Sequence, residues 1–336
     1  MLAPARVACF RTDRLGDLVL AMPAMAALAR ALPSGTVTAV VAPRNVELLA
    51  GQPWVGAVFG WEPARGLGAL RRFLRERRFD AAVLLYPRLG AALAALAAGV
   101  PIRVGTSTRW YASLFNRRLR VHRSENLRHE AAYNFDLLAP WGVTAPTAPA
   151  LVAPLVPYAA REAGTALLAG GGVSGPYVVV HPGSGGSALN AGPRHYGVIA
   201  HAVEAAGLAV VFTGTQGERG RLAEAAAAAG LGPERMLFPP SLMTLAAVLA
   251  GARAVIGSST GPVHLAAALG VHVVALFPPL HAQQPVRWRP WTDRGTVLVP
   301  HAAICPSCLL GACPLYNCLE RIPAMDVATA ALGAAR

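Results

Sequence analysis

The sequence predicts an α/β protein made of two doubly wound domains, in which helices cover both faces of a parallel sheet. Short apolar runs alternate with longer helical patterns along the chain, and this alternation is typical of parallel sheets. The alternation stops in the proline-rich stretch 144–157, which has no periodicity, and then starts again. A length of 336 residues suits two domains of about 150 residues each. We therefore expect one domain over residues 1–155 and another over 156–336.

Each domain is expected to begin with an apolar strand that leads through a loop into a helix. The first domain has strand patterns at 6–10, 36–41 and 81–86, a helical pattern through residue 31, and a basic helix at 67–78. The second has strand patterns at 177–181, 208–212, 254–257 and 272–277, separated by helices at 193–206, 219–229, 241–250 and 261–269. Ligands bind at the carboxyl ends of such strands, so two domains facing each other would form a ligand cleft.

Composition excludes several classes of protein. Hydrophobic residues make up 54% of the chain, too many for a disordered protein, and five cysteines are too few for a disulfide-rich one. The longest apolar stretch, at 89–102, is too short to span a bilayer. Charged residues between positions 11 and 17 interrupt the N-terminal segment where a secretory signal would have its apolar core. We therefore expect a soluble, cytoplasmic protein.

The charge of the chain is strongly basic and unevenly distributed. All 30 basic residues are arginines, and the net charge is +13. Residues 1–155 hold 19 arginines and nine acidic residues, a net charge of +10. A GC-rich genome would produce this excess of arginine, but arginine also carries a forked donor that suits phosphate and carboxylate groups. The basic half therefore has two candidate partners, nucleic acid and an anionic membrane surface.

A loop rich in charged residues connects the first strand to the first helix and reads RTDRLGDLVLAMPAMAAL, from Arg11 to Leu28. Asp17 stands where this loop becomes the helix. A carboxylate there can cap free amide groups and interact favourably with the helix dipole. Alternatively, Asp17 faces the cleft as a general base toward a hydroxyl group. Asp13 is a weaker candidate, because we expect it to pair with Arg11 or Arg14.

A second candidate site is the segment GSSTGPVHLAAALG at 257–270, where a strand ends and a helix begins. Thr260 is suited to cap this helix, which opens with Gly261 and Pro262. Free amide groups at such a helix start bind anions, and a diphosphate would fit them well. His264, in the first turn, can add a further donor to that anion.

A third candidate is the glycine-rich loop HPGSGGSALNAG at 181–192, which follows a predicted strand. Glycines let a backbone approach a phosphate closely. The loop does not match GxxxxGK[ST], so it is not a P-loop.

Four cysteines lie close together near the end of the chain, at Cys305, Cys308, Cys313 and Cys318. Thiols so close together can hold zinc or an iron–sulfur cluster, but zinc pairs are usually further apart than in this C-x2-C-x4-C-x4-C spacing. Disulfides are not expected in a reducing compartment. We expect these cysteines to be structural, without a catalytic metal.

Together these motifs resemble glycosyltransferase family 9, the bacterial lipopolysaccharide heptosyltransferases. RTDRLGDLVLAMPAM resembles the N-terminal signature of the family, and VVVHPGSGG resembles the opening of its second domain. The stretch SLMTLAAVLAGARAVIGSSTGPVHLAAALGVHVVALFPP is similar to its donor-site block, and CPSCLLGACPLYNCL to the cysteine tail of one branch. The likeness runs from about Val7 to Val327.

The resemblance implies a GT-B fold of two Rossmann-like domains facing across a cleft. It also implies an inverting, metal-independent transfer from an ADP-activated sugar, such as ADP-heptose, to a lipid-linked lipopolysaccharide core. No cofactor is implied beyond this donor substrate. Contact with the inner face of the cytoplasmic membrane would bring such an enzyme to its acceptor.

The resemblance also assigns roles to residues of this chain. Residues 1–155 would hold the acceptor, with Asp17 as the base and Arg11, Arg14 and Gly16 beside it. Residues 156–336 would bind the nucleotide-sugar, and the final helix is a candidate to pack back on the N-terminal domain. The residues expected to hold the donor are Ser184, Ser259, Thr260, Gly261 and His264.

Three positions depart from the family pattern. Members usually carry a lysine and a tryptophan just before the proline that opens the helix after the glycine loop, where this chain has Asn190 and Gly192. An aspartate common before the Thr-Gly pair is Ser259 here. These changes indicate a different donor sugar, weaker catalysis or no catalysis. Arg194 is a candidate to replace the lost positive charge.

Three alternatives to a transferase follow from these observations. A non-catalytic protein that binds nucleotide-sugars or lipids would explain the departures, whereas the retained Asp17 favours a transferase. A two-domain nucleotide-sugar epimerase is less favoured, because the best local matches belong to the transferase family. A nucleic-acid-binding protein is supported by charge alone, so we expect no nucleic-acid partner.

Overall fold

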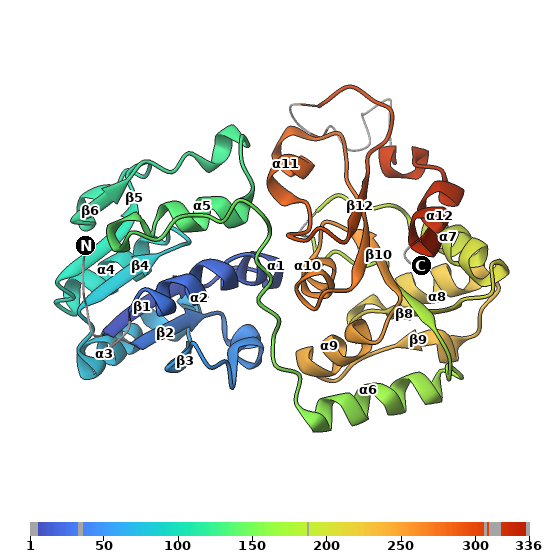
Figure 1. Ribbon diagram of the computed structural model, residues 1–336, viewed down its shortest axis with the longest axis horizontal. Coiled ribbons are helices and arrows are strands. Elements are labelled where there is room, and N and C mark those ends of the chain that lie inside the picture. The colour runs from blue at the N-terminus through green and yellow to red at the C-terminus, as the bar shows by residue number, and fades with distance from the viewer. Residues whose placement is uncertain (1–5, 33–35, 187, 306–307, 309–316, 334–336) are drawn as a thin grey trace. The chain divides into compact units, whose positions relative to one another are not determined.

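The computed structural model describes residues 6–32, 36–186, 188–305, 308 and 317–333. Its contacts divide the chain into two compact units, residues 1–155 and 156–336, and each is described separately (Figure 1). The boundary falls within residues 144–157, which form neither helix nor strand. Among the described residues, no helix is both long enough and apolar enough to cross a bilayer.

The first unit contains a six-stranded parallel sheet in the order β3-β2-β1-β4-β5-β6. The strands are β1 (Arg6–Arg11), β2 (Thr36–Val41), β3 (Ala57–Gly60), β4 (Ala81–Leu84), β5 (Ile102–Thr106) and β6 (Arg117–Leu119). The helices are α1 (Leu15–Val19), α2 (Met22–Arg30), α3 (Gly66–Arg77), α4 (Leu89–Ala97) and α5 (Glu130–Asp136). Because the first strand lies inside the sheet, between β2 and β4, the chain winds outward in both directions, as in a doubly wound fold.

The two faces of this sheet are covered by different helices. Ala8 and Phe10 of β1 share an apolar core with Leu70 and Leu74 of α3 and with alanines of α4. Helix α2 contacts β2 and also contacts α5 (Figure 1). Successive side chains of a strand point to opposite faces, so a strand covered on both faces must be apolar throughout, as residues 7–10 of β1 are.

The second unit repeats this plan, with a parallel sheet in the order β12-β11-β10-β7-β8-β9. Its strands are β7 (Tyr177–His181), β8 (Ala209–Thr213), β9 (Met236–Leu237), β10 (Ala254–Ser258), β11 (His272–Leu276) and β12 (Gly295–Leu298). Its helices are α6 (Tyr158–Gly170), α7 (Pro193–Ala205), α8 (Arg219–Ala229), α9 (Leu242–Ala250), α10 (Gly261–Ala268), α11 (Pro285–Trp288) and α12 (Ala324–Gly333). The predicted α/β class is thus confirmed.

The last described helix, α12, packs within its own unit. It contacts α7, and its residues Val327, Ala328 and Ala331 are fully buried in the same apolar core as β7 and β8. The expectation that this helix also packs on the N-terminal domain stays a prediction.

Several elements were not predicted from the sequence. Four of the missed strands, β3, β6, β9 and β12, are the outermost strands of the two sheets. They are two to four residues long and mostly half-exposed, so they lack the apolar run of a buried strand. Strand β5 and helices α4 and α6 were also missed. The helical pattern through residue 31 forms two helices, because α1 ends at Val19 and α2 starts anew with Pro23 in its first turn.

Candidate active site

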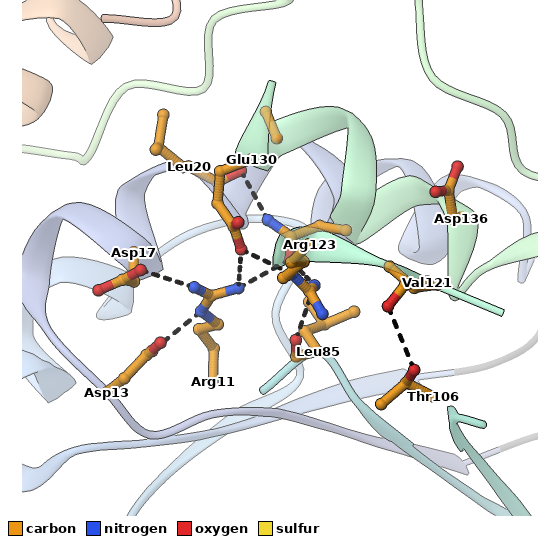
Figure 2. A network of polar contacts seen from close by, with 12 residues as sticks. Arg11, Asp13, Asp17, Leu20, Leu85, Thr106, Val121, Arg123, Glu130 and Asp136 are labelled. Atoms are coloured by element: carbon orange, nitrogen blue, oxygen red, sulfur yellow. Dashed lines mark hydrogen bonds and ion pairs between the residues drawn. The ribbon is translucent and has the colours of Figure 1, made fainter. Parts of the chain in front are cut away.

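A first candidate site lies at the carboxyl end of β1. This strand ends at Arg11, whose side chain is only 2% exposed. A buried guanidinium group is stable only when acceptors, preferably charged ones, surround it. The short loop after β1 leads directly into α1 and brings Asp13 and Asp17 to this guanidinium (Figure 2).

Arg11 binds both of these carboxylates. Its Nε donates to Asp13 Oδ1 at 2.9 Å, as expected from the sequence, and its Nη2 donates to Asp17 Oδ1 at 2.8 Å. Helix α1 has no side-chain hydrogen bond at its N-cap, which is Arg14, so Asp17 pairs with Arg11 rather than capping the helix. The side chain of Asp17 is 16% exposed. The site therefore presents a partly accessible carboxylate that is fixed by a buried cation.

Two residues of α5 complete the surroundings of Arg11, and sequence analysis missed both. Glu130 Oε1 and Asn134 Oδ1 accept hydrogen bonds from Arg11 Nη1 at 3.0 Å and 2.8 Å. Arg123 binds the same two acceptors, through Nε to Glu130 at 2.9 Å and through Nη2 to Asn134 at 3.1 Å. Glu130 and Asn134 are one helical turn apart, so they share a face of α5. They follow Arg11 by 119 and 123 residues, and no local motif connects them.

The charges in this cluster alter the protonation of its members. Burial by itself would lower the pKa of Arg11, but the carboxylates of Asp13, Asp17 and Glu130 raise it above its ordinary value. Burial raises the pKa of Asp13 to about 6, although the neighbouring Arg11 acts in the opposite direction. Arg11 therefore stays charged, whereas Asp13 is partly protonated at mildly acidic pH.

The other residues expected on the acceptor side lie near this cluster in the chain. Gly16 is buried within α1, and Arg14 is exposed at the N-cap position with an extended backbone. Arg44, which sequence analysis missed, donates from Nη2 to the backbone carbonyl of Asp13 at 3.1 Å. It follows β2 and so comes from the same edge of the sheet as Arg11.

A second candidate site lies in the other unit, at the start of α10. β10 ends at Ser258 and α10 begins at Gly261, so Ser259 and Thr260 form the whole connection. Thr260 occupies the N-cap position but makes no side-chain cap bond, contrary to expectation, and its Oγ1 is buried without a hydrogen-bond partner among the described residues. His264 is 4% exposed in the first turn of this helix. A buried hydroxyl at a helix N-terminus is well placed to bind an anion.

The glycine-rich loop starts at the same sheet edge as Thr260. β7 and β10 are adjacent parallel strands, with His181 opposite Gly257, so the loops that follow them begin side by side. Gly185 and Gly186 adopt positive φ angles of 51° and 69°, a conformation that other residues disfavour. Ser184 lies half-buried in this loop. The two segments expected to bind a diphosphate thus follow neighbouring strands of the same sheet.

Two residues that depart from the family pattern make bonds inside the second unit. Asn190 Nδ2 donates to the carbonyl of Pro182 at 2.5 Å, and its Oδ1 accepts from Tyr196 Oη at 2.6 Å. Asn190 therefore ties together the two ends of the glycine-rich loop. The Gly192 N–H donates to Glu320 Oε1 at 2.9 Å, and a Cβ on Gly192 would lie 2.5 Å from that oxygen. Glu320 thus occupies space that a larger residue at position 192 would need.

Arg194 does not supply a positive charge to this loop. Its side chain is 83% exposed and pairs with Glu224 of α8 at 3.0 Å. Arg221, also on α8, reaches the loop instead and donates to the carbonyl of Ala191 at 3.4 Å. Sequence analysis missed Arg221 because only the fold brings α8 beside the loop.

The cysteine cluster is described only in part, because Cys313 lies outside the described residues. Cys305 and Cys318 are half-buried, and Cys308 is exposed. Within the described ranges, no group of three or more His, Cys, Asp or Glu side chains is arranged to hold a metal ion.

Comparison with known proteins agrees with the motifs. The model for glycosyltransferase family 9 (heptosyltransferase) matches residues 67–315. A protein of Haemophilus influenzae named "Putative glycosyltransferase" is 28% identical over 316 residues, which cover 90% of this chain and 89% of that protein.

Solved structures share the fold. The crystal structure of a family 9 glycosyltransferase from Veillonella parvula matches with a TM-score of 0.80 at 20% identity, over 99% of this chain and 97% of that one. The Escherichia coli heptosyltransferase WaaC with ADP matches with a TM-score of 0.65 at 21% identity, over 88% of this chain and 93% of that one. Since the family model covers most of its length, this chain belongs to glycosyltransferase family 9 and is a glycosyltransferase with the GT-B fold.

Proposed function

We propose that this enzyme transfers heptose from ADP-heptose to a lipopolysaccharide core or a similar lipid-linked saccharide, with inversion and without a metal ion. The observation that carries the proposal is the Asp17 carboxylate, which is partly exposed and held by the buried Arg11 at 2.8 Å. In a glycosyltransferase, a carboxylate fixed in this way suits the deprotonation of an acceptor hydroxyl.

In the proposed reaction, Asp17 accepts the proton of the acceptor hydroxyl while that oxygen attacks the anomeric carbon of the donor. The bond from this carbon to the diphosphate breaks on the opposite face, so the configuration inverts and ADP leaves with the bonding electron pair. Arg11 holds the Asp17 carboxylate in place through the charge-assisted hydrogen bond from Nη2. Asp17 thus gains the proton that the acceptor loses.

The departing diphosphate is proposed to bind at the start of α10. Backbone amides there, the buried hydroxyl of Thr260 and the side chain of His264 can stabilise the negative charge that develops on the leaving group. Ser184 in the neighbouring loop and Ser259 and Gly261 beside Thr260 complete the proposed donor contacts. The structure of WaaC with ADP supports a nucleoside diphosphate as the bound part of the donor.

The test of this function is a transfer assay with purified enzyme, ADP-heptose and a lipopolysaccharide core that lacks heptose. We expect a product heavier by one heptose, with the configuration opposite to that of the donor, seen by mass spectrometry and NMR. Because Asn190, Gly192 and Ser259 depart from the family pattern at the proposed donor side, nucleotide-sugars with other sugars are assayed in parallel. Transfer from another donor alone, or retention of configuration, would contradict the proposal.

Replacing His264 by Ala is expected to weaken the binding of ADP by roughly 10- to 150-fold. A hydrogen bond to a charged phosphate contributes about 1.5–3 kcal/mol, and His264 lies in the first turn of the proposed site. Titration calorimetry with ADP measures this without turnover. His201→Ala, on α7, is a matched control that should leave the affinity unchanged. Wild-type ADP affinity in His264→Ala would exclude His264 from the donor site.

The proposed transfer needs no metal ion, because helix amides and polar side chains would stabilise the leaving group. We therefore expect full turnover after prolonged dialysis against EDTA. A loss of activity that zinc or iron restores would contradict this expectation and would direct attention to the cysteine cluster.

An anionic, lipid-linked acceptor would also account for the basic surface of the first unit. Arg117 and Arg118 are exposed on β6, at the edge of the sheet, and the exposed Arg120 follows directly. Charged residues on an edge strand also discourage pairing with other chains. We propose that these arginines in addition attract the enzyme to the anionic cytoplasmic leaflet, where each contributes about 1 kcal/mol.

Changing Arg117, Arg118 and Arg120 together to Gln is expected to weaken binding to anionic vesicles by roughly 100-fold, on the basis of about 1 kcal/mol for each arginine. Co-sedimentation with vesicles of anionic or neutral lipid measures the effect, and added salt should release the wild-type enzyme. The triple change Arg161, Arg253 and Arg321 to Gln removes the same charge from the second unit and should have little effect. Equal binding to both kinds of vesicle, insensitive to salt, would disprove the membrane role.

A further inference from the structure

Glu130 is a buried carboxylate that takes no part in the proposed proton transfer. The residue is completely buried, and its Oε1 accepts from two guanidinium groups, those of Arg11 at 3.0 Å and Arg123 at 2.9 Å. Burying a carboxylate is unfavourable unless its charge is fully compensated. Replacing a buried ion pair with apolar residues of similar size often leaves the stability of a protein unchanged or higher. The use of Glu at this position therefore calls for a role beyond packing.

Asn134 makes the same contacts one helical turn further along α5. Its Oδ1 accepts from Arg11 at 2.8 Å and from Arg123 at 3.1 Å. Its Nδ2 donates to the backbone carbonyl of Leu20 at 3.2 Å, and Leu20 is the C-cap of α1. Asn134 thus contacts Arg11, which precedes helix α1, and Leu20, which directly follows it, and Asp17 lies on this helix.

These contacts fix the direction of the Arg11 side chain. A guanidinium group is planar, so the positions of two of its nitrogens determine that of the third. Nη1 is held by Glu130 and Asn134 and Nε by Asp13, which leaves Nη2 directed at Asp17. Figure 2 shows Asp13, Asp17 and Glu130 around this guanidinium group. Asp17 itself lies on a helix of only five residues and is partly exposed, so Arg11 is the contact that orients it.

We propose that Glu130 and Asn134 are positioning residues for the transfer reaction, which orient the Asp17 carboxylate through Arg11. The proposal rests on the role of Asp17 as base given above. In this arrangement Glu130 and Asn134 of α5 fix the Arg11 side chain, and Arg11 in turn fixes the Asp17 carboxylate. Loss of either positioning residue would leave Asp17 in place but poorly aligned with the acceptor hydroxyl.

The test is a double-mutant cycle on the rate of sugar transfer. Glu130→Gln keeps the shape and the acceptor oxygen but removes the charge. We expect kcat to fall roughly 10- to 100-fold, the range typical of a misplaced catalytic group, while the affinity for ADP stays unchanged. In the Asp17→Asn background the same change should have almost no further effect, because residues that act as one unit are strongly non-additive.

Two comparisons separate positioning from a general loss of structure. Glu125→Gln, in the 3-10 helix Arg123–Glu125, removes an exposed carboxylate of the same unit and should leave kcat unchanged. Asn134→Ala is the second variant if Glu130→Gln fails to fold. Circular dichroism and urea unfolding identify the variants that are folded, and only those enter the cycle.

The possible outcomes distinguish this inference from the proposed function. Wild-type kcat in folded Glu130→Gln and Asn134→Ala, with activity lost in Asp17→Asn, would overturn the positioning role and leave the base in place. If Glu130→Gln lowered kcat by the same factor in the wild type and in Asp17→Asn, the positioning role would be overturned as well. Wild-type kcat in Asp17→Asn would overturn the proposed base itself.

Discussion

Asp17→Asn is expected to lower kcat for sugar transfer by about 10²–10⁴-fold, the usual effect of losing a general base. Asparagine has nearly the same shape and can still accept a hydrogen bond from Arg11 Nη2, but it cannot take up the acceptor proton. The affinity for ADP should stay close to the wild-type value, because the proposed donor contacts belong to the other unit. Product formation under saturating donor and acceptor measures the rate, and calorimetry measures the affinity.

Two further variants make this result specific. Asp136→Asn removes a carboxylate that pairs with Arg128 on the same unit, away from Arg11, and should retain wild-type turnover. Asp13→Asn removes the other carboxylate of the Arg11 loop and should affect the rate much less than Asp17→Asn. If Asp13→Asn abolished transfer and Asp17→Asn did not, Asp13 and not Asp17 would be the base.

The fold could be predicted from the sequence wherever strands are buried on both faces. The expected strands at 36–41 and 177–181 coincide with β2 and β7, whose residues are almost all buried and mostly apolar. The outermost strands could not be predicted, because hydrogen bonding to a single neighbour leaves them half-exposed. β6 reads Arg-Arg-Leu, and nothing in that composition indicates a strand.

The site could be predicted in part, for a related reason. Arg11, Asp13 and Asp17 lie within seven residues of one another, so the local motif predicted that Asp13 pairs with Arg11 or Arg14 and that Asp17 lies at the start of the helix. The contact between Arg11 and Asp17 was not predicted. Glu130 and Asn134 come from α5, and only the packing of α5 against α2 brings them to Arg11. The sequence nevertheless indicated that such partners exist, because an arginine at the end of a buried strand requires acceptors from elsewhere in the chain.

The roles of two residues in the glycine-rich loop at 181–192 could not be predicted from its motif. Asn190 and Gly192 depart from the family pattern, and the structure shows what they do in this chain. Asn190 closes the loop, and Gly192 makes room for Glu320. The role of Gly192 depends on a contact over 128 residues of sequence, whereas that of Asn190 depends on contacts with Pro182 and Tyr196 nearby in the chain.

Arg11→Met is expected to destabilise the first unit by roughly 3–5 kcal/mol, the cost of removing one partner from a buried ion pair. Glu130 and Asp13 would remain buried with less compensation, because each would lose its ion pair with Arg11. Hydrogen exchange followed by mass spectrometry localises the effect, and amides of β1 and α5 should exchange about 10²–10⁴-fold faster. Arg128→Met, which breaks an exposed pair with Asp136, should change exchange by less than about tenfold.

A combined variant tests the electrostatic origin of this loss. Arg11→Met together with Asp13→Asn and Glu130→Gln removes the carboxylates of Asp13 and Glu130 along with their shared cation. Part of the stability should be recovered, because neither carboxylate is then buried without Arg11, although Arg123 loses its ion pair with Glu130. Transfer should remain impaired in the combined variant, since Asp17 would still lack the cation that orients it. If the three changes were instead additive in stability, the loss in Arg11→Met would be a packing defect, and Arg11 would act on Asp17 by shape and not by charge.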